Sequence, residues 1–128
     1  MSEFRDDVKY AKTHEWVKVE GDVAVIGLTD HAQDQMGDLV FAEVVPVGTV
    51  VAAEENVGSI ESVKMAADVV SPVSGEVIEA NDSIEDAPEQ INEAPYETWL
   101  VKIRLSDPAE VDQLLDKDGY ASFIAEEA

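Results

Sequence analysis

Lys64 is the residue whose setting best suits it to chemistry. Within residues 58–72, two short β-prone runs bounded by Gly, Ser or Pro lie on either side of it, as is typical of paired strands. A lysine between two such strands stands at an exposed hairpin tip, where another enzyme can reach its amine and attach a group. Gly48 and residues 72–75 supply turn residues near the base of this hairpin. Spacing alone does not separate an attachment site from an ordinary surface charge.

The residues that usually carry catalysis do not form a site in this sequence. His14 and His31 lie 17 residues apart, without a partner at the spacing of metal ligands. There is no cysteine, no phosphate-binding glycine loop and no nucleophile motif around a serine. We therefore expect a non-catalytic protein without a metal site, in which any redox group is borrowed.

Short strands separated by turn residues must position Lys64. A helix capped by Thr29 or Asp30 and ended by Gly37 is expected between two of them, and residues 81–95 are predicted to form a loop with one helical turn. This pattern predicts a mainly β fold, a compact sandwich or flattened barrel. The predicted strands, besides the two around Lys64, are residues 15–19, 22–28, 39–45, 76–79 and 99–105.

The apolar period changes from strand-like to helix-like after residue 106. Asp107 and Pro108 resemble a helix start, and apolar residues then recur on one helical face. Gly119 is expected to end this helix before a second one. We expect residues 1–128 to form one domain, with a helical tail at about 107–126 that covers a sheet face.

The charge balance is strongly acidic, with 29 acidic residues, 8 basic residues and a net charge of −21. A surface of this kind repels nucleic acid and anionic membranes. We expect a cytoplasmic protein, and the charge favours a salty cytoplasm, such as that of a halophile, over a mature mitochondrial form. Salt screens self-repulsion, so a melting temperature that is the same in dilute buffer and molar salt would contradict this hypothesis.

Several runs along the chain resemble the glycine cleavage system H protein family. The runs around Thr13–His14–Glu15–Trp16 and Thr29–Asp30–His31–Ala32–Gln33 are specific to this family, whereas the lysine turn is shared with other lipoyl and biotinyl domains. The resemblance covers nearly the whole chain. The matching runs are residues 9–17, 26–34, 37–41, 61–64, 71–77, 91–92, 95–96 and 99–103.

The resemblance implies a fold of the lipoyl/biotinyl-carrier type and a function. Lys64 would carry lipoate as an amide, next to Glu61, Ser62 and Val63. The arm would take the aminomethyl group of glycine from the pyridoxal-phosphate glycine decarboxylase to the tetrahydrofolate-dependent aminomethyltransferase. Dihydrolipoyl dehydrogenase would then reoxidise it. A lipoate ligase or lipoyl transferase would attach the group.

The resemblance also implies a place for the loaded arm to rest. Docking in a groove would keep water from the aminomethyl group, and a carboxylate would hold its ammonium. Glu15 and Asp68 are the candidate carboxylates, with Thr13 as a hydroxyl partner. Without the resemblance, both acids would be interpreted as members of an acidic surface.

Two alternative functions remain open at this stage. A biotinyl carrier is favoured only by the pair Lys64–Met65, since biotinyl domains usually have Met after the lysine. An H-like protein that relays lipoate to other lipoyl enzymes would share the same lysine turn. Intact mass separates lipoate from biotin, and aminomethyl loading by glycine decarboxylase tests the relay.

Overall fold

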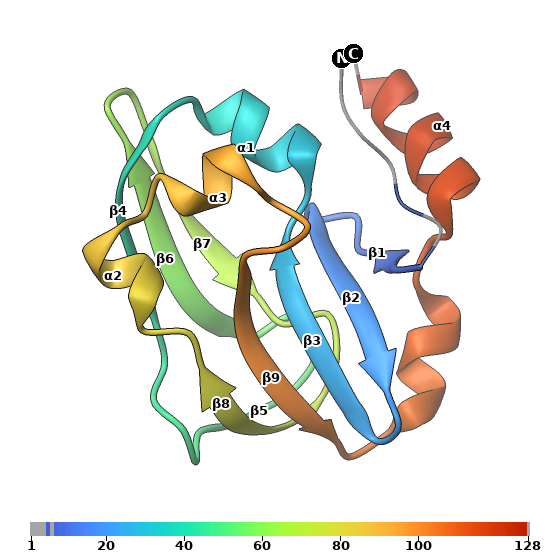
Figure 1. Ribbon diagram of the computed structural model, residues 1–128. Helices are drawn as coiled ribbons and strands as arrows, with labels where there is room; N and C mark the ends of the chain where they lie inside the picture. Colours follow the sequence, from blue (N-terminus) through green and yellow to red (C-terminus); the bar gives the residue numbers. More distant parts are fainter. Residues whose placement is uncertain (1–4, 6, 128) are drawn as a thin grey trace.

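The computed structural model describes residue 5 and residues 7–127, which fold into two facing β-sheets with helices at the edges (Figure 1). The larger sheet has six strands in the order β1-β2-β3-β9-β8-β5, and the smaller has the order β4-β6-β7. All pairings are antiparallel. The mainly β prediction is therefore confirmed.

The seven longer strands follow the predicted ranges closely, whereas the two-residue strands β1 and β5 are not among the predicted ones. Strand β5 is a short piece that pairs with β8, through Val50 and Glu76, rather than with its sequence neighbours. The strand bounds are β1 Lys9–Tyr10, β2 Glu15–Glu20, β3 Val23–Leu28, β4 Leu39–Val44, β5 Val50–Val51, β6 Asn56–Ser62, β7 Ala66–Val70, β8 Gly75–Ala80 and β9 Trp99–Leu105.

The core lies between the two sheets, because alternate residues of each strand point inward. Ile26 and Ile103 from the larger sheet join Ile60 and Val69 from the smaller sheet in one buried cluster. The larger sheet also buries part of its other face, where Trp16 and Val25 pack with Tyr120 in a second cluster. The packed sheets give the hairpin of β6 and β7 a rigid base.

A short helix, α1 (Asp30–Met36), links the two sheets. The Thr29 hydroxyl accepts a hydrogen bond from the Ala32 amide at its start, and Gly37, at φ 81°, follows its end. Both ends agree with the prediction, because each depends on a local capping residue.

The sequence prediction was incomplete between residues 81 and 95. Two helical turns form there, α2 (Ser83–Asp86) and α3 (Gln90–Glu93), instead of one. Ile84 and Ile91 are fully buried, one from each turn. Burial of these two side chains against the core supports turns whose local sequence is poor in helix signals.

The C-terminal segment differs from its prediction in where the break falls. The first helix, expected to end at Gly119, is a 3-10 helix, η1 (Pro108–Gln113), that ends before Leu114. Gly119 instead lies inside the second helix, α4 (Lys117–Glu127). Leu115 lies between the two and exchanges backbone hydrogen bonds with Tyr10, at 2.7 and 2.8 Å. This tertiary pairing, rather than the glycine, interrupts the helical tail. Across the described ranges, no helix has the length and apolar character needed to span a membrane.

Candidate functional site

Lys64 lies where the sequence predicts it, exposed at the tip of the hairpin between β6 and β7. Ser62 fixes the shape of this tip. Its backbone amide donates to the Met65 carbonyl at 2.8 Å, and its hydroxyl oxygen accepts from the amides of Lys64 and Met65 at 3.3 and 3.2 Å. Glu61 and Val63, the other two predicted neighbours, are exposed. The turn is therefore rigid while the lysine side chain is free to be reached.

The side chain of Lys64 passes over Gly37, at the end of α1. A Cβ on Gly37 would lie 3.3 Å from Lys64 Cε and 3.6 Å from Nζ. Asn92 holds this corner, because its amide nitrogen donates to the Gly37 carbonyl at 2.9 Å and its amide oxygen accepts from the Leu39 amide at 2.9 Å. The local sequence predicts Gly37 only as the end of a helix, since no local pattern indicates its contact with Lys64.

Strand β7 leads from Lys64 toward the N-terminal part of the chain. Ala67 and Val69 pack inward, so Ala66, Asp68 and Val70 share the outer face. Asp68 is exposed, four residues after Lys64 and third in β7. A group attached to Lys64 therefore has a continuous strand face to follow.

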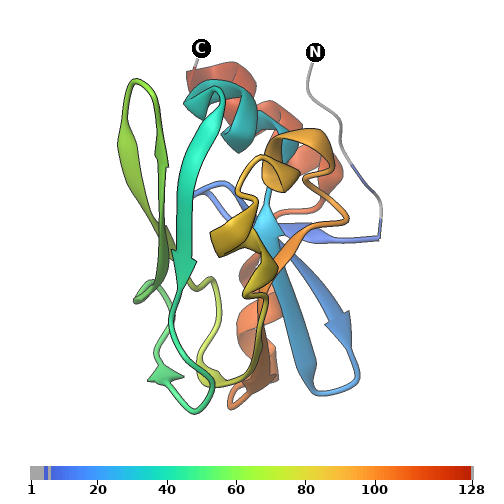
Figure 2. The same cartoon turned by 60° about the vertical axis from the view of Figure 1, so that its left-hand side comes forward.

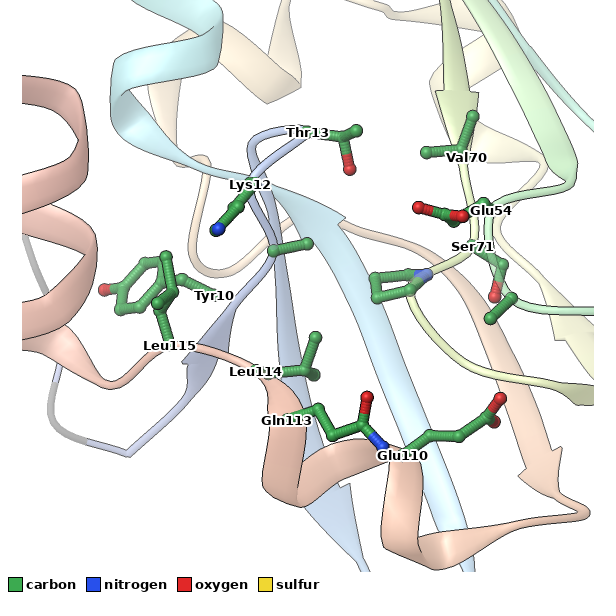
Figure 3. Close-up of a pocket in the computed structure, with 13 residues that line it drawn as sticks. Tyr10, Lys12, Thr13, Glu54, Val70, Ser71, Glu110, Gln113, Leu114 and Leu115 are labelled. Atoms are coloured by element: carbon green, nitrogen blue, oxygen red, sulfur yellow. The ribbon is translucent and has the colours of Figure 1, made fainter. Parts of the chain in front are cut away.

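A groove of about 330 Å³ lies where this face meets the loop before β2 (Figure 3). Thr13 and Val70 stand on opposite sides of one end of the groove, and Glu54 lies on the Val70 side. Glu110 and Gln113 form its other end, from η1. The loop before β2, a turn at residues 53–54, the end of β7 and η1 are distant in sequence and together build one cleft.

Glu15 is buried beside this groove, with only 2% of its surface exposed. Its carboxyl group accepts a hydrogen bond from the Thr13 hydroxyl and interacts with the Val70 backbone amide. Burial raises the pKa of Glu15 to about 8, and the hydrogen bonds from Thr13 and Val70 only partly offset this. Glu15 is therefore mostly protonated at pH 7, which corrects its interpretation as a surface carboxylate.

The turn that carries Thr13 and Glu15 is held by the C-terminal helix. His14 adopts a left-handed conformation, at φ 74°, and its Nδ1 lies 2.8 Å from the Tyr120 hydroxyl. The same hydroxyl is 2.8 Å from Thr29 Oγ1. Tyr120 is fully buried and stacks on Tyr10, with ring centroids 4.5 Å apart. No local sequence pattern indicates these contacts, because they join residues about a hundred positions apart.

The structure brings some of the predicted site residues together and separates another. Thr13 and Glu15 are in contact, whereas Asp68 lines a different, shallow depression with Glu61 and Ala66. His14 and His31, distant in sequence, have ring centroids 5.0 Å apart. Among the described residues, no group of three or more potential ligands of the His, Cys, Asp and Glu types gathers around a common point.

A model of the family described as "Glycine cleavage H-protein" matches residues 8–127. The chain belongs to this family. A Marinomonas protein named glycine cleavage system H protein is 54% identical and covers 98% of the chain and 100% of that protein. A mitochondrial H protein 2 of Arabidopsis thaliana is 47% identical over 94% of the chain and 78% of its own length.

The solved structures agree with this assignment. A crystal structure of a glycine cleavage system H protein from Mycobacterium marinum has a TM-score of 0.87 and 32% identity, over 95% of this chain and 99% of that one. The function expected for the family, the lipoyl carrier of the glycine cleavage system, is confirmed at this level. The biotinyl alternative rested on Lys64–Met65 alone and loses its support.

Proposed function

We propose that Lys64 carries lipoate on Nζ and that the protein shuttles the aminomethyl group of glycine between enzymes. The donor is the pyridoxal-phosphate glycine decarboxylase and the acceptor is the tetrahydrofolate-dependent aminomethyltransferase. Dihydrolipoyl dehydrogenase restores the disulfide, and a lipoate ligase or lipoyl transferase attaches the group. The observation that carries this proposal is an exposed lysine on a clamped hairpin tip in a member of the H-protein family. We infer that this takes place in the cytoplasm.

The residues around Lys64 fit an attached acyl chain. Nζ is accessible, and Gly37 has no side chain where the lysine stem passes. Lipoate, when bound, supplies the dithiolane that accepts the aminomethyl group, which a chain without cysteine cannot supply itself. Attachment also removes the positive charge of Lys64, so the net charge goes from −21 to −22.

The groove beside Thr13 gives the loaded arm a place to rest. Its walls exclude part of the surrounding water, which protects a group that water would destroy. The cargo is an ammonium at neutral pH, and Glu15 is the buried acid between the two residues that face each other across the groove. Approach of a positive charge lowers the pKa of a nearby carboxyl group, so the cargo itself favours ionisation of Glu15.

The raised pKa of Glu15 also limits how tightly the cargo is held. Ionising an acid with a pKa of about 8 at pH 7 costs about 1.4 kcal/mol, or tenfold in population. That cost is subtracted from the attraction between carboxylate and ammonium. Weak holding suits a carrier, because the next enzyme must withdraw the arm from the groove.

Asp68 has a different role in this proposal. It is exposed on the strand face between Lys64 and Val70, so it attracts the ammonium along the path rather than holding it at the end. Exposed ion pairs contribute only ~0–1 kcal/mol. Glu15 should therefore determine the lifetime of the docked cargo.

Intact mass spectrometry tests the attachment. Incubation with lipoate, ATP and a lipoate ligase should add the mass of one lipoyl amide to the protein and none to the Lys64→Arg variant. The other five lysines remain in that variant as an internal control. A lipoyl group on another lysine, or on none, would refute the assignment of Lys64.

Decay of the loaded protein tests the resting place. After loading with glycine and glycine decarboxylase, Glu15→Gln should lose its aminomethyl group about tenfold faster or more, as expected for losing a hydrogen bond to a charged group worth ~1.5–3 kcal/mol. Asp68→Asn should change the rate less than about fivefold. Equal decay of the wild type and both variants would exclude docking at these acids, while leaving Lys64 as the carrier lysine.

A further inference from the structure

Exposed apolar side chains lie on either side of Lys64 in the sequence and on β4, the strand next to β6. Val63 is 80% exposed and Met65 is 47% exposed, on either side of the lysine, and Val40 and Phe41 of β4 are 57% and 40% exposed. We call these four residues the tip patch. The hairpin of β6 and β7 projects from the body beside β4 in both views (Figures 1 and 2).

An irregularity in β4 explains why two neighbouring residues face outward. Leu39 pairs with Ser62 and Phe41 pairs with Glu61, so the register shifts between them. Leu39 and Ala42 point into the core, which leaves Val40 and Phe41 together on the outer face. A β-bulge of this kind redirects side chains at functional surfaces.

The proposed arm path leaves the β4 half of this patch uncovered. The path follows β7 toward Thr13, whereas Val40 and Phe41 lie on β4, across β6 from it. Four of the seven large apolar side chains that are exposed in the described part of the chain belong to the patch. Such a cluster at a modification site indicates contact with another protein.

The charges around the patch are of one sign. Lys64 is the only lysine or arginine between residues 19 and 101, a range with 18 acidic residues. Asp38, Glu61 and Asp68 are exposed beside the hairpin or along it. A partner that fits this surface needs an apolar depression bordered by basic side chains, because opposite potentials across an interface speed encounter and fix register.

We propose that the tip patch is the docking surface for the enzyme that acylates Lys64, and that this enzyme presents an apolar depression bordered by basic residues. The proposal rests on the function proposed above. An acylating enzyme must hold Nζ at its acyl donor, so it must contact the residues next to the lysine and the neighbouring strand. A few buried apolar residues in the centre of such a contact carry most of its binding energy.

Two double variants compare this surface with a matched control. Phe41→Ser with Met65→Ser removes two patch residues, and Val47→Ser with Val50→Ser removes two residues that are 61% and 76% exposed. The control residues follow the end of β4 that is opposite Lys64, since Val44 pairs with Gly58 and Leu39 with Ser62. Both variants should unfold at nearly the same urea concentration as the wild type, because exposed substitutions change stability little.

The measurement is kcat/KM for lipoylation by lipoate ligase, followed by intact mass. The kcat/KM of the patch variant should fall tenfold or more, mainly because KM rises. The kcat/KM of the control variant should fall less than twofold. Raising salt should lower kcat/KM of the wild type and of the control. An activated lipoyl ester, which needs no enzyme, should label Lys64 equally in all three proteins.

Each outcome separates the two proposals. If the wild type is not lipoylated at Lys64, the proposed function fails. If it is lipoylated, and the patch variant reacts as fast as the control, the docking surface is wrong and the carrier lysine stands. Normal lipoylation of the patch variant with slow loading by glycine decarboxylase would assign the patch to that enzyme and overturn this proposal.

Discussion

Lys64 and Glu15 lie in opposite environments of the same small protein. Lys64 is exposed at a hairpin tip that Ser62 holds through hydrogen bonds, and its side chain passes over Gly37. Apolar residues on either side of it face solvent. Glu15 is buried in a turn that a threonine, a histidine and a tyrosine from the far end of the chain keep in place. The difference fits the two tasks proposed above, because an attachment point must be reached by enzymes while a resting place must keep its shape.

The largest expected change in the free energy of unfolding comes from replacing Glu15 by a side chain that does not ionise at high pH. Its pKa rises from 4.5 to about 8 on folding, so between these values the folded state binds a proton that the unfolded state has lost. Below pH 4.5 this group does not change the free energy of unfolding. Between pH 4.5 and 8 the free energy of unfolding decreases as the pH rises, and above pH 8 this group lowers it no further. At ~1.4 kcal/mol per pKa unit, the penalty approaches about 5 kcal/mol.

Urea unfolding of Glu15→Gln and the wild type at pH 4.5 and pH 8.5 measures this penalty. Gln keeps the shape and the acceptor for the Thr13 hydroxyl but does not ionise. The variant should be several kcal/mol more stable than the wild type at pH 8.5 and nearly equal to it at pH 4.5. A difference that does not depend on pH would show that Glu15 is ionised in the folded protein throughout.

The second effect concerns the support of the buried turn by α4. Tyr120→Phe keeps the ring stacked on Tyr10 but removes the hydroxyl that contacts His14 and Thr29. Leaving buried partners unsatisfied costs ~1–3 kcal/mol. Ser122→Ala, on the exposed side of the same helix, is the matched control and should change the free energy of unfolding by less than about 0.5 kcal/mol.

A readout at the site distinguishes a positioning role of Tyr120 from a merely structural one. NMR titration should show a changed pKa of Glu15 in Tyr120→Phe, because the turn between Thr13 and Glu15 is no longer fixed. An unchanged titration together with lower stability would limit Tyr120 to the core.

The smallest effects are expected at the tip. Ser62→Ala removes the hydroxyl that accepts from the amides of Lys64 and Met65 and should cost about 1 kcal/mol. Val63→Ser, at an 80% exposed position, should leave unfolding nearly unchanged. Faster amide hydrogen exchange at residues 64 and 65 in Ser62→Ala, but not in Val63→Ser, would confirm that the serine alone fixes the turn. Equal exchange in both would remove this role of Ser62.

The sequence was informative where structure depends on neighbours along the chain. The strands, the ends of α1 and the exposed position of Lys64 follow from alternation, capping and turn residues. Gly119 does not end a helix as predicted, because the break before α4 depends on the pairing of Leu115 with Tyr10. Burial of Glu15 was missed for the same reason, since its partner Val70 lies on another sheet.

The contact of Tyr120 with His14 joins residues 106 positions apart. Contacts of such long sequence separation form late, because closing the chain between them costs entropy that is recovered only when both ends are present. During synthesis, the hairpin with Lys64 leaves the ribosome well before Tyr120 does. In the function proposed above, the hairpin that presents Lys64 for acylation is therefore synthesised before the turn around Glu15 can be completed by Tyr120.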